Sequence, residues 1–285
     1  MERKSLSTKH GHFSYLHWQE RPSLPKLFFI HATGFNALTY RRNLEHLKSD
    51  YEIYAIDLRG HGFTQAKADP KEFDSWETYI QDLVSVIDKL DHPIILAGHS
   101  LGSMLCLAIA SRFPHLASHL LMIEPIIMSP FHCKLWGLIK KFGFGHHLNM
   151  AKQASHRRQH FQGKQQILDS YKARGAFKTW PVKVIRDYIE GGTISSSEGI
   201  TLTCQPKWEA KSFANTAHQT WHWLKQVKCK TSLAHATHSS TIAKKSLTII
   251  RRKYPNIGIT EYQSTHFIPM EKEDCIANLI AKLLN

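Results

Sequence analysis

The sequence predicts an α/β fold in which helices cover both faces of a mostly parallel central sheet and a helical cap is inserted into the chain. Two observations predict the layers: short apolar runs alternate with segments of helical spacing, and several runs are continuously apolar, as expected for strands buried on both faces. A third predicts the insertion, because the alternation stops near residue 125 and resumes near residue 226. We expect a core of residues 1–124 and 226–285 and a cap of residues 125–225.

The elements before the cap follow in order. Phe13, Tyr15 and Trp18 lie in an aromatic-rich stretch that predicts one or two opening strands, and Lys26–Ile30 is a continuous apolar run typical of a buried strand. Apolar residues recur at helical spacing between residues 76 and 90. The full expectation is strands at 26–30, 51–56, 94–98 and 119–123, and helices at 39–47, 76–90 and 101–113.

Beyond the cap the alternation predicts three further core elements and a closing helix. A strand near 231–234 precedes a basic helix at 242–253, and a second strand covers 257–262. Residues 274–284 place apolar side chains on one face of a helix. Within the cap itself the pattern is aromatic, basic and helical, so we expect no core strands there.

Charge and composition argue against several function classes. The formal net charge is +14, and twelve Lys and Arg residues against three acids lie between residues 131 and 190. This surplus matches no helix-turn-helix, zinc-finger or RNA-binding signature, so no nucleic-acid partner is expected. We interpret it as a solvated basic face, with weak contact to an anionic membrane surface as the alternative. No apolar run is long enough for a transmembrane segment.

The spacing of the cysteines and histidines indicates the cellular compartment and whether a metal site is expected. Five scattered cysteines without a C-x-x-C pair, behind a charged N-terminus, predict reduced thiols and a cytoplasmic protein. No metal site is expected, because none of the histidine pairs at i, i+4 contains the glutamate of H-E-x-x-H. No glycine-rich phosphate loop is present, so no nucleotide or other cofactor is expected. The three pairs are His115 and His119, His156 and His160, and His218 and His222.

The segment Gly98-His99-Ser100-Leu101-Gly102 matches G-x-S-x-G between a predicted strand and a predicted helix. In this context the serine sits on a tight turn with its hydroxyl exposed above the sheet, and the glycines avoid steric clashes that a Cβ would cause. The start of the helix aims backbone N–H groups at the place where an oxyanion would form. Ser100 is therefore the candidate nucleophile.

A serine hydroxyl needs a neighbouring base, usually a histidine that a carboxylate orients. Among twenty histidines, His266 lies in the loop after the last predicted strand. This is the same carboxyl edge of the sheet as the turn Gly98–Gly102 that holds Ser100, which we call the elbow. Because open α/β sheets bind ligands at that edge, we predict His266 as the base.

Taken together, these motifs resemble the α/β-hydrolase family over nearly the whole chain. The resemblance rests on the loop His31-Ala32-Thr33-Gly34, the turn from Asp57 to Gly62, the elbow, the cap and the late Thr265-His266-Phe267 loop. It implies the α/β-hydrolase fold and a triad in the chain order nucleophile, acid, histidine.

The position of the catalytic acid departs from the commonest pattern of this family, in which an aspartate follows the penultimate strand. In this chain no Asp or Glu occurs between Glu209 and Glu261. Some members instead carry the acid after the strand that follows the elbow helix, which here is Glu124. A carboxylate that ends an apolar strand needs a partner, and an imidazole would supply one. The alternatives are a structural glutamate or a catalytic dyad with water in place of the acid.

The same resemblance implies two backbone donors for an oxyanion, Leu101 after the nucleophile and Thr33 in the loop after the third strand. Ala32 replaces the usual first glycine of that loop, so Ala32 is the alternative donor. His31 is expected to brace the loop.

Together the residues and the resemblance predict a serine hydrolase that cleaves an ester-like bond of a small molecule through an acyl-enzyme. Aromatic side chains of the cap are expected to roof an apolar acyl pocket or to form the core of the cap. Thioester, lactone or carbon–carbon cleavage, an acyltransferase, a cofactor-free haloperoxidase and a non-catalytic binding protein are the alternatives. The cap aromatics are Trp136, Phe142, Phe144, Phe161, Phe177 and Trp180.

Overall fold

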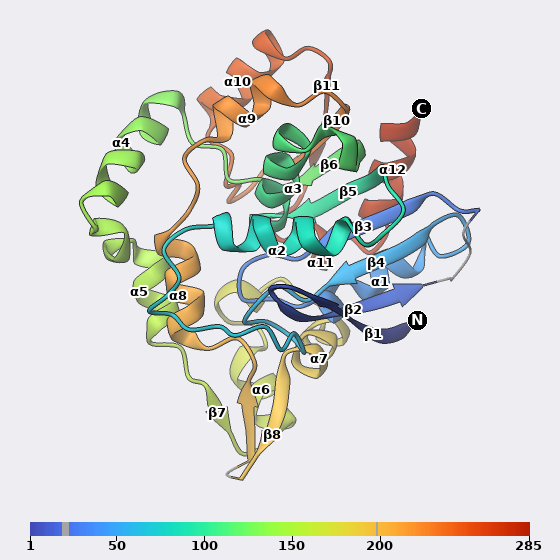
Figure 1. The fold of residues 1–285 in the computed structure, drawn as a ribbon. Helices are drawn as coiled ribbons and strands as arrows, with labels where there is room; N and C mark the ends of the chain where they lie inside the picture. The colour runs from blue at the N-terminus through green and yellow to red at the C-terminus, as the bar shows by residue number, and fades with distance from the viewer. Residues whose placement is uncertain (19–22, 198) are drawn as a thin grey trace.

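The computed structural model describes residues 1–18, 23–197 and 199–285. Among them, eight strands form one mixed sheet in the order β1-β2-β4-β3-β5-β6-β10-β11 (Figure 1). The pairs β1–β2 and β2–β4 are antiparallel and all pairs from β4 to β11 are parallel, which confirms the predicted mostly parallel sheet. The strands are β1 Glu2–Thr8, β2 Gly11–Trp18, β3 Lys26–Ile30, β4 Glu52–Ile56, β5 Ile94–His99, β6 Ala117–Ile123, β10 Lys230–Ala236 and β11 Ile257–Tyr262.

Helices cover both faces of this sheet, and the side chains of each strand alternate between two apolar clusters. In β3, Phe28 and Ile30 belong to the cluster that includes α3, whereas Leu27 and Phe29 belong to the cluster that includes α12. The helices outside residues 125–225 are η1 Ala37–Tyr40, α1 Arg41–Glu45, α2 Glu77–Ile87, α3 Leu101–Arg112, η2 Pro114–Leu116, α10 Lys244–Lys253, α11 Ile268–Glu271 and α12 Cys275–Leu284.

Helix α3, which follows the elbow, is apolar around its whole circumference and is almost completely buried. It packs between strands β5 and β6 on one side and helices α2 and α9 (Thr220–Gln226) on the other. Because both sides of α3 meet protein, its sequence carries no polar stripe. Its N-terminus is thereby held at the carboxyl edge of the sheet.

Two local predictions differ from the structure. Strand β1 was not predicted, because its residues ERKSLST are mostly polar and form an edge strand with exposed and half-buried positions. The helix expected at 39–47 is divided into η1 and α1. Asn36 caps η1 by accepting a hydrogen bond from the amide of Thr39, which fixes the start of this segment at the residue after the loop that holds Thr33.

The segment 125–225 is mainly helical and, as expected, contributes no described strand to the core sheet, but it contains strands of its own. Three short strands form a small antiparallel sheet in the order β7-β9-β8, and they are too short and polar for recognition by periodicity. The elements are α4 Pro130–Lys141, η3 Phe144–His147, α5 Asn149–Ser155, β7 His160–Phe161, α6 Lys164–Tyr171, η4 Gly175–Phe177, α7 Val182–Gly191, β8 Thr193–Ser196, β9 Gly199–Leu202, α8 Pro206–Ala214 and α9 Thr220–Gln226. Within the described ranges, every helix is too short or too polar to span a lipid bilayer.

Candidate active site

Ser100 occupies the turn between β5 and α3 with a strained backbone. Its φ of 53° and ψ of −113° lie in a region that non-glycine residues rarely adopt. Its amide donates to the carbonyl of Ile123 at 2.9 Å, and its carbonyl accepts from the amide of Met104 at 3.2 Å. The residue keeps 8% of its surface exposed. Backbone strain held by such contacts is typical of functional positions.

The two glycines of the elbow are required by close backbone contacts. A Cβ on Gly98 would lie 2.4 Å from the carbonyl carbon of Gly102, and a Cβ on Gly102 would lie 2.0 Å from the carbonyl oxygen of Ile30. Neither contact is tolerable, so only glycine fits. The second contact also brings the end of β3, and with it the following loop, against the start of α3.

His266 and Glu124 form a hydrogen-bonded pair although 142 residues separate them. Nδ1 of His266 lies 2.9 Å from Oε2 of Glu124, whose side chain is fully buried. A carboxylate accepts only, so Nδ1 carries the proton and Nε2 is left as the basic nitrogen. Within the described residues no hydrogen bond joins Ser100 to His266. Catalytic contacts of this kind are often long before substrate binds.

The carboxylate of Glu124 has five donors. Oε1 accepts from the amide of Ala236 at 2.7 Å and the hydroxyl of Ser240 at 2.7 Å. Oε2 accepts from the amide and the hydroxyl of Thr241 at 2.9 and 3.2 Å, in addition to His266. Burial disfavours the charge, but the hydrogen bonds from His266 and the two amides outweigh it and lower the pKa of Glu124. The carboxylate therefore stays ionised at neutral pH.

Three of these donors, from Ser240 and Thr241, belong to the loop after β10, where the usual acid of the family is missing. The side chain of Glu124 reaches across from the end of β6 and fills the position beneath this loop with its carboxylate. Glu124 also adopts a left-handed φ of 48°, which turns the chain sharply after the strand. The geometry fits the predicted acid; its catalytic role stays a prediction.

A second histidine, His99, links the elbow to the loop of His266. Its Nε2 lies 2.9 Å from the backbone carbonyl of His266, and its Nδ1 lies 2.8 Å from the hydroxyl of Tyr40. Since a carbonyl only accepts, Nε2 carries the proton and the hydroxyl of Tyr40 donates to Nδ1. Burial, followed by the charge of His266, holds the pKa of His99 well below its ordinary value. Because His99 directly precedes Ser100, its neutral ring holds the backbone of His266 close to the elbow.

The hydroxyl of Tyr40 also affects which of the two candidate oxyanion donors is available. The amide of Ala32 donates to Tyr40 at 3.1 Å and the amide of Gly34 donates to Nε2 of His61 at 3.0 Å. The amide of Thr33 between them has no hydrogen-bond partner in the part of the chain that the structure describes. Leu101 is the first residue of α3, where amides lack partners within the helix. These contacts favour Thr33 over Ala32 as the second donor.

Sequence reasoning missed the role of Tyr40, and it predicts a measurable effect. The change Tyr40→Phe frees the amide of Ala32 and removes the donor to His99, so kcat for an ester is expected to fall about tenfold with little change in KM. The matched control is Tyr79→Phe, which removes a buried hydroxyl bonded to Ser212 away from the site. Equal losses in the two variants would show that Tyr40 acts on stability alone.

Two buried histidines brace the loop that contains Thr33. The amide of Leu58 donates to Nε2 of His31 at 3.0 Å, so its Nδ1 donates to the carbonyl of Ala32 at 2.7 Å. His61 likewise accepts from Gly34 and donates from Nδ1 to the carbonyl of Arg59 at 3.0 Å. Burial lowers the pKa of His31 to about 4 and that of His61 to about 3.

These depressed values predict an acid-sensitive stability. In the unfolded state both rings bind a proton near pH 6.5, whereas in the folded state His31 does so only near pH 4 and His61 only near pH 3. The two neutral rings therefore stabilise the fold above pH 6.5, and this contribution is lost as the pH falls. Between pH 7 and pH 5 the free energy of unfolding is expected to drop by about 4 kcal/mol through them. Urea unfolding at both pH values measures it. Gln in place of His31 should remove about half of the drop, whereas Gln in place of the exposed His160 should not.

An aromatic cluster joins the segment 125–225 to the site loops. Phe35 lies edge-to-face on Trp180 with ring centroids 5.1 Å apart, and Trp180 lies 5.5 Å from Phe267 in the same way. Phe177 packs 4.8 Å from Trp180. The indole N–H of Trp180 is buried and has no hydrogen-bond partner among the described residues. Aromatic side chains of this segment therefore contact both the loop of Thr33 and the residue after His266.

Three of the predicted roof aromatics lie elsewhere. Phe142 and Phe144 are exposed, because they follow α4 on the outside of the molecule. Trp136 is buried, but its indole N–H donates to the carbonyl of Thr216 inside the segment 125–225. Phe161 belongs to the buried cluster that also contains Phe177. For the exposed pair, both expected roles, roofing a pocket and forming the core of the cap, are wrong.

A buried ion pair also reaches the loop of Thr33. Arg157 donates to Oε2 of Glu209 at 2.9 Å and to the hydroxyls of Tyr171 and Tyr188. A Cβ on Gly34 would lie 2.2 Å from Oε1 of Glu209, so this carboxylate packs directly on the loop. Glycine is thus required at position 34 both for this contact and for its φ of 76°.

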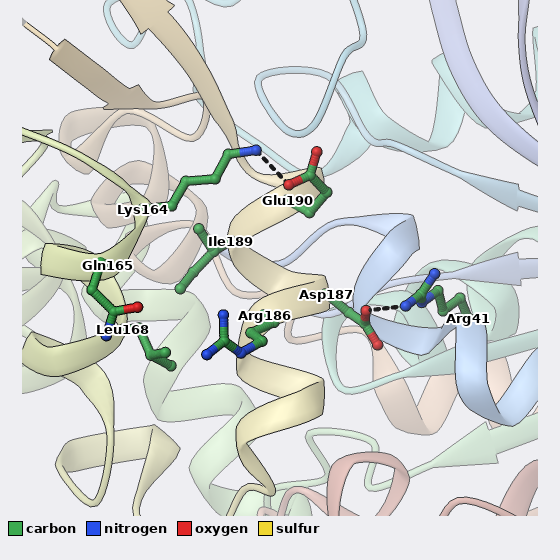
Figure 2. A pocket seen from close by; sticks show the side chains of 8 residues that line it. All are labelled: Arg41, Lys164, Gln165, Leu168, Arg186, Asp187, Ile189 and Glu190. Atoms are coloured by element: carbon green, nitrogen blue, oxygen red, sulfur yellow. Dashed lines mark hydrogen bonds and ion pairs between the residues drawn. The ribbon is translucent and has the colours of Figure 1, made fainter.

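A separate hollow of about 330 Å³ lies between α6, α7 and the start of α1 (Figure 2). Four of its charged residues pair with one another: Lys164 with Glu190, and Arg41 with Asp187 at 2.7 Å. None of its lining residues belongs to the predicted site. We interpret it as the seam between α7 and the core. The described residues contain no group of three His, Cys, Asp or Glu side chains that could hold a metal ion.

Solved structures share this fold over almost the whole chain. The thioesterase domain from the curacin biosynthetic pathway has a TM-score of 0.77 with 20% identity, and covers 99% of both chains. An esterase of M. tuberculosis has a TM-score of 0.71 with 20% identity, covering 99% of this chain and 91% of its own. At this identity the likeness shows the fold alone.

Curated relatives match over shorter stretches. Epoxide hydrolase 4 of Mus musculus is 30% identical over 113 residues, and pimeloyl-[acyl-carrier protein] methyl ester esterase of Vibrio parahaemolyticus is 27% identical over 108 residues. The alignments cover 31% and 40% of these relatives, so the chain spans well under half of their length. The sequence profile of the alpha/beta hydrolase family matches residues 27–218, about two thirds of the chain. The resemblance of the motifs is thus confirmed, and the chain belongs to the alpha/beta hydrolase family.

Proposed function

We propose that this protein is a serine hydrolase that cleaves a carboxylic ester of a small molecule through an acyl-enzyme. The observation that carries the proposal is the strained Ser100 on the elbow, with the pair of Glu124 and His266 hydrogen-bonded at the same edge of the sheet. His99 supports it further, because its ring joins the elbow to the backbone of His266.

In the proposed reaction the hydroxyl oxygen of Ser100 attacks the ester carbonyl while Nε2 of His266 takes its proton. Glu124 stays ionised and stabilises the imidazolium. The amides of Leu101 and Thr33 donate to the oxyanion. Collapse of the tetrahedral intermediate breaks the bond to the alcohol oxygen, which receives the proton from His266. Water, deprotonated by His266, then attacks the acyl-enzyme and releases the acid and Ser100.

The identity of the nucleophile argues against epoxide hydrolysis, the activity in the name of one relative. Attack of a serine oxygen on an epoxide carbon would form an alkyl ether, and water does not cleave an ether under these conditions. Attack on an ester or thioester carbonyl instead forms an acyl-enzyme that water can hydrolyse. The chemistry of Ser100 therefore favours acyl transfer to water.

The segment 125–225, which we propose as the cap, supports an apolar acyl group. Phe35, Trp180 and Phe267 form an aromatic wall beside the site loops. The unpartnered indole N–H of Trp180 would meet a polar atom of the substrate or water, since a buried donor without a partner costs roughly 1–3 kcal/mol.

The proposal is tested with p-nitrophenyl esters of increasing acyl length and with a fluorophosphonate probe. We expect covalent labelling of the protein and turnover that rises beyond the acetate ester. Absence of both labelling and turnover in the folded protein would favour the binding-protein alternative.

A further inference from the structure

The outer face of α4 carries an apolar stripe that lies open to solvent. Phe131, Leu135, Leu138 and Phe142 are 70%, 43%, 55% and 69% exposed. At 3.6 residues per turn these positions fall within about 60° of one another around the helix axis. We call these four residues the α4 stripe. Large apolar side chains gathered on one exposed face mark an interaction surface.

The orientation of α4 is held by its opposite face. Cys133 and Trp136 are buried, and the indole N–H of Trp136 donates to the carbonyl of Thr216 at 2.8 Å. The ammonium of Lys140 donates to the carbonyls of Asn215 and Thr216 at 3.0 and 3.1 Å. In Figure 1, α4 lies at the periphery of the molecule, away from the central sheet. The α4 stripe is therefore turned outward by specific contacts.

The surroundings of the α4 stripe are cationic. Residues 125–168 contain seven Lys and Arg residues and no Asp or Glu. On the helix, Lys134 and Lys141 each follow a stripe residue by three positions, so both lie on the same flank of the stripe. Close by, a trough of about 570 Å³ between α5 and α8 has an alanine floor and includes Lys71, Lys152, Lys207 and Lys211 in its lining.

We propose that the α4 stripe docks on the surface of an anionic lipid bilayer. Helix α4 would lie in the plane of the interface, with the four apolar side chains below the headgroups and Lys134 and Lys141 at the level of the phosphates. An apolar face flanked by lysines suits such a surface, because insertion and attraction to anionic lipid then act together. A second copy of the chain is a poor occupant, since two identical cationic faces of a chain with net charge +14 would repel. The inference is independent of catalysis by Ser100.

Vesicle flotation of the full chain tests this docking. We expect the protein to float with phosphatidylcholine vesicles that contain phosphatidylglycerol at about 0.1 M salt, where charges act over roughly 10 Å. Binding should weaken at high salt and on vesicles of phosphatidylcholine alone. A wild-type protein that does not float with the anionic vesicles overturns the proposal.

Matched variants distinguish binding through the α4 stripe from binding through the positive charge of the whole protein. The pair Phe131→Ser and Leu138→Ser is expected to lower the partition coefficient at least about tenfold, because each removes apolar area that insertion would bury. The control pair Phe63→Ser and Ile194→Ser changes exposed apolar residues elsewhere and should leave partitioning unchanged. Gln in place of Lys134 should weaken binding about fivefold and reduce its salt dependence.

Two further outcomes would overturn the proposal. Undiminished flotation of the stripe variant would mean that the basic surface alone attracts the vesicles, or that another segment inserts. A dimer of the wild type in sedimentation velocity that becomes a monomer in the stripe variant would assign the face to a second copy. Thermal unfolding checks that the variants fold, and the pair Leu135→Gln and Phe142→Gln repeats the test if the first pair does not.

Discussion

Alanine in place of Ser100 is expected to abolish turnover of a p-nitrophenyl ester and labelling by a fluorophosphonate. The loss in kcat/KM should reach roughly 10⁴- to 10⁶-fold, since no other group in the proposed mechanism forms the covalent intermediate. The fold should be retained, because the side chain of Ser100 makes no hydrogen bond within the described residues. Steady-state kinetics and gel detection of the probe measure the two effects.

The matched control is Ser111→Ala, on helix α3, which follows Ser100. Both serines keep 8% of their surface exposed, but the hydroxyl of Ser111 bonds to the side chain of Gln226 instead of facing the site. This control should label and turn over as the wild type does. Labelling that persists in Ser100→Ala would place the nucleophile on another residue and refute the proposed mechanism.

The second large effect is expected from Glu124→Gln, with a fall in kcat of roughly 10³- to 10⁴-fold. If the amide oxygen keeps the bonds from Ala236 and Ser240, the NH₂ group faces His266 and forces Nδ1 to accept. Nε2 then carries the proton and cannot take one from Ser100. If the amide is reversed, the buried amide of Ala236 and the half-buried hydroxyl of Ser240 lose their acceptor, and the loop after β10 is destabilised.

The control for this variant is Glu271→Gln, which makes the same change in charge on the loop of His266. The carboxylate of Glu271 accepts from the amide of Thr265 at 3.0 Å and from hydroxyls of the loop and of Thr179, but it does not touch the imidazole. A loss below about tenfold is expected there. Full activity of Glu124→Gln, or equal losses in the two variants, would remove Glu124 from the mechanism as the acid.

The predicted layers were recovered because their signal is local. The continuously apolar strands and the helical spacing between them follow from burial on two faces, and the structure has the mostly parallel sheet that they predict. Strand β1 and the small sheet of β7, β8 and β9 were missed, because short polar strands at an edge do not alternate clearly. The exposure of Phe142 and Phe144 was missed because an aromatic residue in a sequence does not show which side of a helix it will occupy.

For the candidate site, residues that form a motif within a short stretch could be predicted from the sequence, whereas residues that act on distant parts of the chain could not. Ser100 and its glycines lie within five residues, and the absence of acids between Glu209 and Glu261 directed attention to Glu124. Tyr40 and Thr241 gave no signal, since the hydroxyl of Tyr40 bonds His99 and the amide of Thr241 bonds Glu124, and both partners are far away in the chain. His99 was within the elbow motif, but its link to the carbonyl of His266 exists only after folding.

The sequence by itself determined the elbow, because the close contact between Gly98 and Gly102 and the turn at Ser100 arise within five consecutive residues. It also determined the alternation that places the loops at one edge of the sheet. Only the tertiary structure showed that the carboxylate of Glu124 hydrogen-bonds His266, that the amide of Thr33 has no partner among the described residues, and that the α4 stripe faces outward. The physical reason is that these properties depend on contacts between residues that are distant in the chain. The spacing of residues in the sequence and its composition do not show which side chains meet in the folded protein.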